Sequence, residues 1–159
     1  MFGKKSTSVK LTKDSMYDLI KNAFETNGLK YNGLDDQKVI QTGFMGDDLP
    51  IALNIYVDDL AIRFVSMLNL KAEPENFSKV AWELNCINKK LKFGCFYLDP
   101  DDGFIMFEYG FPYAEADVSE GFILAFTKMV ADTVDAHDGD LKKIAERTQR
   151  SSAPDNMYG

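Results

Sequence analysis

Apolar residues recur three and four positions apart in three stretches of the chain, a spacing that predicts amphipathic helices. The first helix is expected to begin after Thr12, a favoured N-cap residue, and to end at Gly28, which supplies a left-handed cap. The third is expected to begin where Asp117 and Glu120 form a variant of the capping box, and to end at Gly139. The predicted helices cover residues 12–27, 74–91 and 117–139, with a short further turn over residues 141–147.

Between the helices the apolar period changes to two, which predicts half-buried strands. Asp58-Asp59 predicts a tight hairpin in which Val57 faces Leu60, and residues 100–103 predict a four-residue loop between the last two strands. After a turn at residues 32–33, strands are expected over residues 40–44, 49–57, 60–68, 93–98 and 104–109.

The predicted order of elements is α-β-β-β-α-β-β-α. Tight hairpins imply an antiparallel sheet, and three amphipathic helices can cover one of its faces. We therefore expect an α+β fold, a two-layer sandwich of antiparallel sheet and helices, forming one domain over residues 11–147. Residues 1–10 are expected to be loosely ordered, and the polar residues 148–159 have the composition of a disordered tail.

The last predicted hairpin is apolar on both of its faces, although one apolar face is enough to join a core. Its second face is expected to carry Phe93, Tyr97, Phe104 and Met106. A contiguous apolar surface of this kind marks an interface or a groove. We therefore predict that these four residues bind a partner, and the alternative is that a loop or a chain end covers them.

Two residues of the second predicted helix stand out. Trp82 is the only tryptophan and lies off the apolar stripe, so it is either an anchor for a partner or the edge of a wide core. Asn88 lies near the centre of that stripe, where an amide is costly unless it is hydrogen-bonded. It either contacts a ligand in a pocket or bonds to a neighbouring backbone group.

Charge narrows the classes of partner. The 159-residue chain has a net charge of -7 and lacks the basic footprint expected for binding nucleic acid or an anionic membrane surface. The start of the chain does not resemble a signal peptide, and no apolar run reaches the ~18 residues of a membrane span, so the cytoplasm is the expected location.

The sequence contains no catalytic or metal-binding constellation. His137 is the only histidine, and its spacing from the surrounding aspartates matches no established metal motif. Cys86 and Cys95 lack metal or redox spacing, and the acidic turns are typical of aspartates that bond their own backbone. We therefore expect no enzyme activity, no metal and no cofactor. An enzyme would need carboxylates that converge with His137 in a cleft.

The order of elements resembles the type III secretion chaperone-like fold, and residues 76–113 resemble the YbjN family of bacterial proteins. The resemblance covers roughly residues 10–147. It lies in a helix carrying Asn85 and Asn88, an aromatic strand, the turn at residues 101–103, a second strand and an amphipathic helix. It implies a small, acidic, non-enzymatic protein. Members of the fold bind partner polypeptides, commonly as homodimers, and the YbjN family has been linked to regulation of sensory transduction.

These observations predict a protein-binding module, chaperone-like or regulatory, that acts as a homodimer through the aromatic sheet face and also binds an unidentified polypeptide. The alternative is a small-molecule-sensing regulatory domain with a pocket between the sheet and the helices around Asn88.

Overall fold

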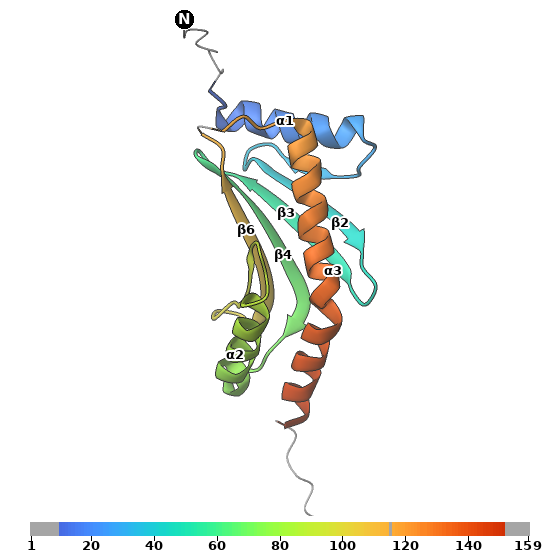
Figure 1. The fold of residues 1–159 in the computed structure, drawn as a ribbon, viewed down its shortest axis with the longest axis vertical. Helices are drawn as coiled ribbons and strands as arrows, with labels where there is room; N and C mark the ends of the chain where they lie inside the picture. Colours follow the sequence, from blue (N-terminus) through green and yellow to red (C-terminus); the bar gives the residue numbers. More distant parts are fainter. Residues whose placement is uncertain (1–9, 115, 152–159) are drawn as a thin grey trace, which may run out of the picture.

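The computed structural model describes residues 10–114 and 116–151, with side chains described up to Arg147. The elements of this part, in chain order, are α1 (Lys13–Thr26), β1 (Asn32–Leu34), β2 (Val39–Met45), β3 (Pro50–Val57), β4 (Ala61–Lys71), a 3₁₀ turn (Pro74–Asn76), α2 (Phe77–Asn88), β5 (Cys95–Leu98), β6 (Phe104–Pro112) and α3 (Glu120–Ser151). The strands form one six-stranded sheet in the order β1-β2-β3-β4-β6-β5, and every adjacent pair is antiparallel (Figure 1).

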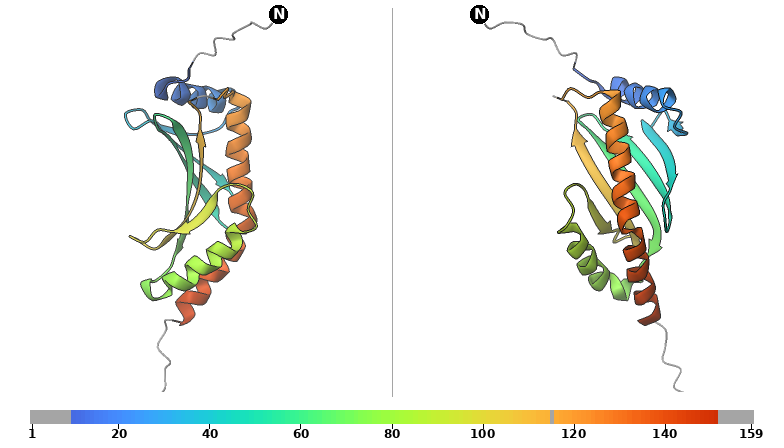
Figure 2. Two further views of the ribbon diagram at one scale, coloured as in Figure 1. Left: turned by 60° about the vertical axis from the view of Figure 1, so that its left-hand side comes forward. Right: turned by 45° about the vertical axis from the view of Figure 1, so that its right-hand side comes forward.

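The helices lie on one side and at the ends of this sheet. α3 runs lengthwise across one face and contacts β3 and β4, α1 crosses one end, and α2 lies at the other end beside β5 (Figures 1 and 2). In the described part of the chain no helix crosses the opposite face of the sheet (Figure 2). The core therefore lies between α3 and the sheet, where the buried side chains include Leu53, Ile55, Phe64, Phe107, Ile123 and Val130.

The predicted fold class, an α+β two-layer sandwich with an antiparallel sheet, is confirmed. α1 begins as expected, because the Thr12 hydroxyl accepts a hydrogen bond from the Ser15 N–H (3.2 Å) and the Ser15 hydroxyl accepts one from the Thr12 N–H (2.8 Å). Asn27 caps the other end, and Gly28 has the left-handed backbone (φ 67°) that the sequence predicts.

The hairpin of β3 and β4 differs from its predicted register. Val57 pairs with Ile62, two residues beyond its predicted partner. The Asp58 N–H donates to the Ala61 carbonyl (2.8 Å), so residues 59–60 make the turn. Because the register moves by two residues, each side chain stays on its predicted face of the sheet.

The predicted order of elements does not contain β1. The prediction of a turn at residues 32–33 is wrong, because these residues belong to that strand. Gly33 pairs with Ile40 of β2, and the turn follows at residues 35–38. Three residues are too few to establish a period of two, so the hydrophobic pattern does not reveal this edge strand.

α3 also differs from its prediction at both ends. It begins at Glu120, where the Ser119 hydroxyl accepts a hydrogen bond from the Phe122 N–H (3.2 Å), rather than at Asp117. The predicted end at Gly139 is wrong, because the helix continues to Ser151.

Close packing, rather than a helix end, explains the glycine at position 139. A Cβ at this position would lie 2.6 Å from a carboxylate oxygen of Asp48, so the glycine lets the β2–β3 turn approach the helix. Beyond it, Leu141 and Ile144 are buried and continue the apolar stripe. The helix thus includes residues 148–151, the first part of the predicted tail. The loosely ordered start and the disordered tail that the sequence predicts otherwise fall on residues 1–9 and 152–159, which lie outside the described residues. Within the described part, no helix is both long and apolar enough to cross a membrane.

Candidate binding surfaces

A row of largely apolar side chains crosses the face of the sheet that lacks a helix. Tyr97 on β5 pairs with Met106 on β6, Met106 pairs with Met67 on β4, and Met67 pairs with Ala52 on β3. Side chains of directly paired residues lie on the same face, so these four residues form one continuous row. Tyr97 and Met106 are half-buried by their neighbours, and Met67 is 46% exposed. We call this surface, together with Phe104, the outer face.

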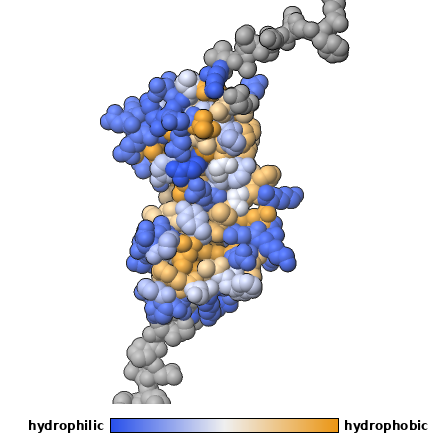
Figure 3. All heavy atoms as spheres, turned by 90° about the vertical axis from the view of Figure 1, so that its left-hand side faces the viewer, coloured by the Kyte–Doolittle hydropathy of each residue, from blue (hydrophilic) through white to orange (hydrophobic). Residues whose placement is uncertain are grey.

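Phe104 extends the outer face toward the loop at residues 100–103. It is paired with Lys71 of β4, whose ammonium lies over the Phe104 ring at 5.7 Å from the centroid. The side of the molecule that carries β5, β6 and α2 shows hydrophobic residues across its middle and lower parts, with hydrophilic residues at its margins (Figure 3).

Charged residues border the outer face. The Glu108 carboxylate accepts hydrogen bonds from the Tyr97 hydroxyl and from the Arg63 guanidinium (both 3.4 Å). Arg63 also donates to Asp58 (2.9 Å) and stacks over the ring of Tyr56 (5.1 Å). Burial and the Glu108 carboxylate raise the pKa of Tyr97, and the bond to Asp58 raises the pKa of Arg63. An apolar centre with a polar border is the usual anatomy of a protein interface.

Phe93 does not belong to the outer face, so the prediction that it lies with Tyr97 is wrong. Its ring makes an edge-to-face contact with Tyr109 (centroids 6.0 Å apart), and Tyr109 packs on Phe126 of α3 (5.3 Å). The cause is Gly94, whose positive φ of 68° interrupts the alternation of side chains before β5. Phe93 therefore lies on the α3 side, where it is 50% exposed.

Trp82 projects into solvent from α2 and is 68% exposed. The alternative that it wraps around the edge of a wide core is therefore wrong. The structure leaves it available as an anchor for a partner, but on α2 rather than on the outer face.

Asn88, at the end of α2, bonds the backbone of β5 at two points. Its amide N–H donates to the Phe96 carbonyl, and its amide oxygen accepts from the Phe96 N–H, both at 2.8 Å. The side chain thus pairs with this edge strand as another strand would. Of the two sequence alternatives for Asn88, the structure displays the bond to a neighbouring backbone group.

His137 and the aspartates around it do not converge. The His137 ring contacts the Thr133 carbonyl through Nδ1 (2.9 Å). The carboxylate of Asp138 is buried and accepts two backbone N–H groups of the β2–β3 turn (3.3 and 2.9 Å), and Asp135 accepts a third (2.6 Å). These aspartates fasten the turn to α3, a role that no local sequence pattern reveals. No group of three or more His, Cys, Asp or Glu among the described residues is arranged to hold a metal ion.

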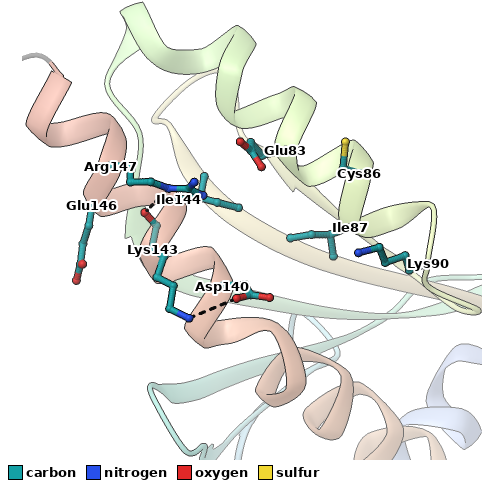
Figure 4. A pocket seen from close by; sticks show the side chains of 9 residues that line it. All are labelled: Glu83, Cys86, Ile87, Lys90, Asp140, Lys143, Ile144, Glu146 and Arg147. Carbon is teal, nitrogen blue, oxygen red and sulfur yellow. Dashed lines mark hydrogen bonds and ion pairs between the residues drawn. The ribbon is translucent and has the colours of Figure 1, made fainter.

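Three of the hollows formed by the described residues lie against α3. The first, of about 540 Å³, lies between α2 and α3, with Ile87 on one side and Ile144 and Arg147 on the other (Figure 4). We call it the interhelix pocket; charges of both signs line it, and Lys143 pairs there with Asp140 (3.6 Å).

The second hollow, of about 550 Å³, lies between residues 90–93 and α3. The third, of about 460 Å³, lies between β2, the end of α1 and α3, and Phe44, Ile51 and Leu124 line it. Asn88 lines none of the three.

Comparison with known proteins agrees with the fold. The chain matches the YbjN family model, described as "Putative bacterial sensory transduction regulator", over residues 17–142. It is similar to the crystal structure of YbjN, "a putative transcription regulator from E. coli" (TM-score 0.60, 15% identity, 84% of this chain and 92% of that chain). It is also similar to a chain of the HopA1–SchA chaperone–effector complex (TM-score 0.54, 11% identity, 81% of this chain and 96% of that chain). No curated protein matches the chain in sequence. The resemblance read from residues 76–113 is confirmed.

Proposed function

The chain belongs to the YbjN family, and on that premise we propose that it is a non-enzymatic, cytoplasmic protein-binding module, chaperone-like or regulatory, that forms a homodimer through its outer face. The observation that carries this proposal is the row from Tyr97 through Met106 and Met67 to Ala52 on a sheet face without a helix. Burying such a row against a second copy removes apolar surface from water, which is the main driving force of association.

The size of the surface sets the expected strength of the dimer. A stable interface usually buries roughly 800 Å² on each partner. The apolar row must therefore be joined by its border, including Phe104, Tyr56 and Arg63. Ion pairs at such a border favour one alignment of the two copies over others, and they contribute less to the affinity than the apolar centre does.

We also propose that a second polypeptide is the other partner. The similar fold of a chain in a chaperone–effector complex supports this class of partner. Trp82 is suited to it, because an exposed tryptophan on a helix gives a large contact area at low entropic cost and does not compete with the outer face. The net charge of -7 favours polypeptides over nucleic acid or anionic membranes.

The experiment is a light-scattering mass over a concentration series for the native chain and for a variant carrying Tyr97→Ser and Phe104→Ser. The native chain is expected to be a dimer and the variant a monomer. The control is Leu60→Ser, which removes a 66% exposed apolar residue from the β3–β4 turn and should leave the dimer intact. A native monomer throughout the series would refute homodimerisation, and thermal unfolding of each variant checks that it folds.

A small-molecule-sensing function is the second candidate. The hollow beside Phe44 and Leu124 lies between the sheet and α3, where such a function needs a pocket. Asn88 is not part of it, because its amide is occupied by Phe96. A shift in unfolding temperature with a metabolite, abolished by Leu124→Trp, would support this alternative.

A further inference from the structure

Residues 90–93 and one face of α3 enclose a hollow that the outer-face interface does not use. Its floor is apolar: Leu91 and Phe93 face Met129, Ala125 and Ala136 across it. Phe93 is half-exposed there and is braced by its contact with Tyr109. We call this hollow the lysine groove; its lining residues are Lys90, Leu91, Lys92, Phe93, Ala125, Lys128, Met129, Asp132, Thr133, Ala136 and His137.

The rim of the lysine groove is basic although the chain is acidic, with a net charge of -7. The rim carries three lysines, Lys90, Lys92 and Lys128, and a single carboxylate, that of Asp132. That carboxylate is paired with Lys128 at 2.5 Å. Lys90 and Lys92 have no carboxylate partner among the described residues. Two free ammonium groups beside an exposed aromatic ring favour a ligand that is both anionic and apolar.

The groove is also elongated. It adjoins the interhelix pocket, because Lys90 lines both. Along α3 the lysine groove extends from Ala125 to His137, about 18 Å at the helical rise of about 1.5 Å per residue. The interhelix pocket, where three carboxylates balance three cations, extends the hollow surface to Arg147, about 33 Å in all. An extended trough of this length suits a stretch of polypeptide rather than a compact metabolite. An amphipathic helix would place apolar side chains at every third or fourth position on its floor.

We propose that the lysine groove docks an acidic amphipathic segment of a partner polypeptide, with apolar side chains against Phe93, Leu91 and Met129 and carboxylates at Lys90 and Lys92. The inference rests on the protein-binding role proposed above and adds the chemistry of the partner. It uses the helical side of the molecule, whereas the homodimer uses the outer face. A negative result for docking in the lysine groove therefore does not contradict the homodimer, and the reverse also holds, provided that the mass and peptide binding are measured separately.

The test uses a fluorescein-labelled amphipathic peptide of about 18 residues, enough for about 27 Å of helix, with Leu and Phe on one face and Glu along its flanks. Its twin has Lys in place of every Glu. Fluorescence anisotropy with the native protein should show saturable binding of the Glu peptide, about tenfold or more tighter than that of the Lys twin. The affinity should fall with added salt, because the contacts at the rim are screened.

Variants locate the site. Lys90→Glu with Lys92→Glu should weaken binding of the Glu peptide by about tenfold or more, and Phe93→Ser should also weaken it. The matched control, Lys13→Glu with Lys79→Glu, makes the same change in net charge at one half-exposed and one exposed position outside the groove and should bind as the native chain does. The substituted residues are half-exposed or exposed, so circular dichroism should report intact folds.

Three results would overturn the proposal. The first is equal binding of the Glu and Lys peptides. The second is an equal loss of binding in the groove variant and its charge-matched control. The third is saturable binding of dodecanoate at the groove without binding of the Glu peptide, which would identify a lipid-like ligand instead. The light-scattering mass of the groove variants is expected to equal that of the native chain, so a lost dimer is distinguished from a lost docking site.

Discussion

Tyr97 and Met106 lie directly opposite each other on β5 and β6, with both side chains on the face opposite that of the buried residues Phe96 and Phe107. Tyr97 also donates its hydroxyl proton toward Glu108, which lies two residues beyond Met106 and ties Tyr97 to the charged border. This pair joins the apolar centre of the outer face to its polar rim. The interface proposed for self-association is centred on it.

The two-point bond between Asn88 and Phe96 should contribute measurably to stability. Asn88→Ala leaves both backbone groups of a buried residue without their partner, so the free energy of unfolding should fall by about 1–3 kcal/mol. Urea unfolding measures the change, and hydrogen exchange should show faster opening of β5. Asn85→Ala, at an exposed position of the same helix, is the control and should stay within about 0.5 kcal/mol of the native chain. Equal effects of the two substitutions would contradict this assignment.

Asp138 should fasten the β2–β3 turn to α3. Asp138→Ala removes a buried acceptor from two backbone N–H groups and should lower the free energy of unfolding by about 1–3 kcal/mol. Hydrogen exchange should locate the loss at residues 46–49. Asp140→Ala removes an exposed carboxylate two residues further along α3 and is expected to cost less than about 0.5 kcal/mol. If Asp140→Ala were the more damaging substitution, the assigned role of Asp138 would be wrong.

Substitution by alanine should lower the stability of the chain at Gly94 but not at Gly121. Gly94 has a positive φ, and a Cβ there would press on the Phe107 ring, so Gly94→Ala should destabilise the chain by about 1–3 kcal/mol. Gly121 lies in the first turn of α3, and its nearest neighbour would be 3.8 Å from a new Cβ. Gly121→Ala should therefore stabilise the chain by up to about 1 kcal/mol. Thermal unfolding of the two variants makes the comparison, and a neutral Gly94→Ala would refute the constraint.

Tyr31 should make stability depend on pH at alkaline values. Its hydrogen bond to Glu25, with burial, raises its pKa from the ordinary 10.0 to about 12. The folded state therefore holds the proton more tightly than the unfolded state, so this contribution is complete below pH 10 and is lost as the pH rises toward 12. Urea unfolding over that window should show a steeper loss of stability for the native chain than for Glu25→Gln. Identical pH profiles would contradict the pKa shift.

The sequence was most informative where a pattern repeats. Periods of 3.6 and 2 predicted the α+β sandwich. The predicted four-residue loop over residues 100–103 gave the correct register of the last hairpin, because Asp99 and Phe104 bond to each other across it. The β3–β4 register was wrong by two residues, because Asp-Asp selects a turn weakly. The pattern did not reveal that Gly139 serves close packing rather than a helix end, because both uses favour the same residue.

The candidate surfaces were predictable in part. Alternation placed Tyr97, Phe104 and Met106 on one face, but it failed at Phe93, because one positive φ at Gly94 turned that side chain to the α3 side. The lysine groove was not predictable, since Lys90 and Lys128 are 38 positions apart in sequence and meet only in the fold. Local patterns determine faces of single elements, whereas grooves depend on how distant elements pack.

The most direct test of the outer face as the dimer interface uses the two native cysteines. Cys95 lies on β5 beside Tyr97, on the outer face, and Cys86 lies on α2 in the interhelix pocket; both are exposed. Alkylation rates of the two thiols are measured by mass spectrometry at one fixed pH across a concentration series that spans association. The account predicts that Cys95 becomes protected as the mass doubles while the rate at Cys86 stays constant. Doubling of the mass without protection of Cys95, or with protection of Cys86 alone, would contradict it.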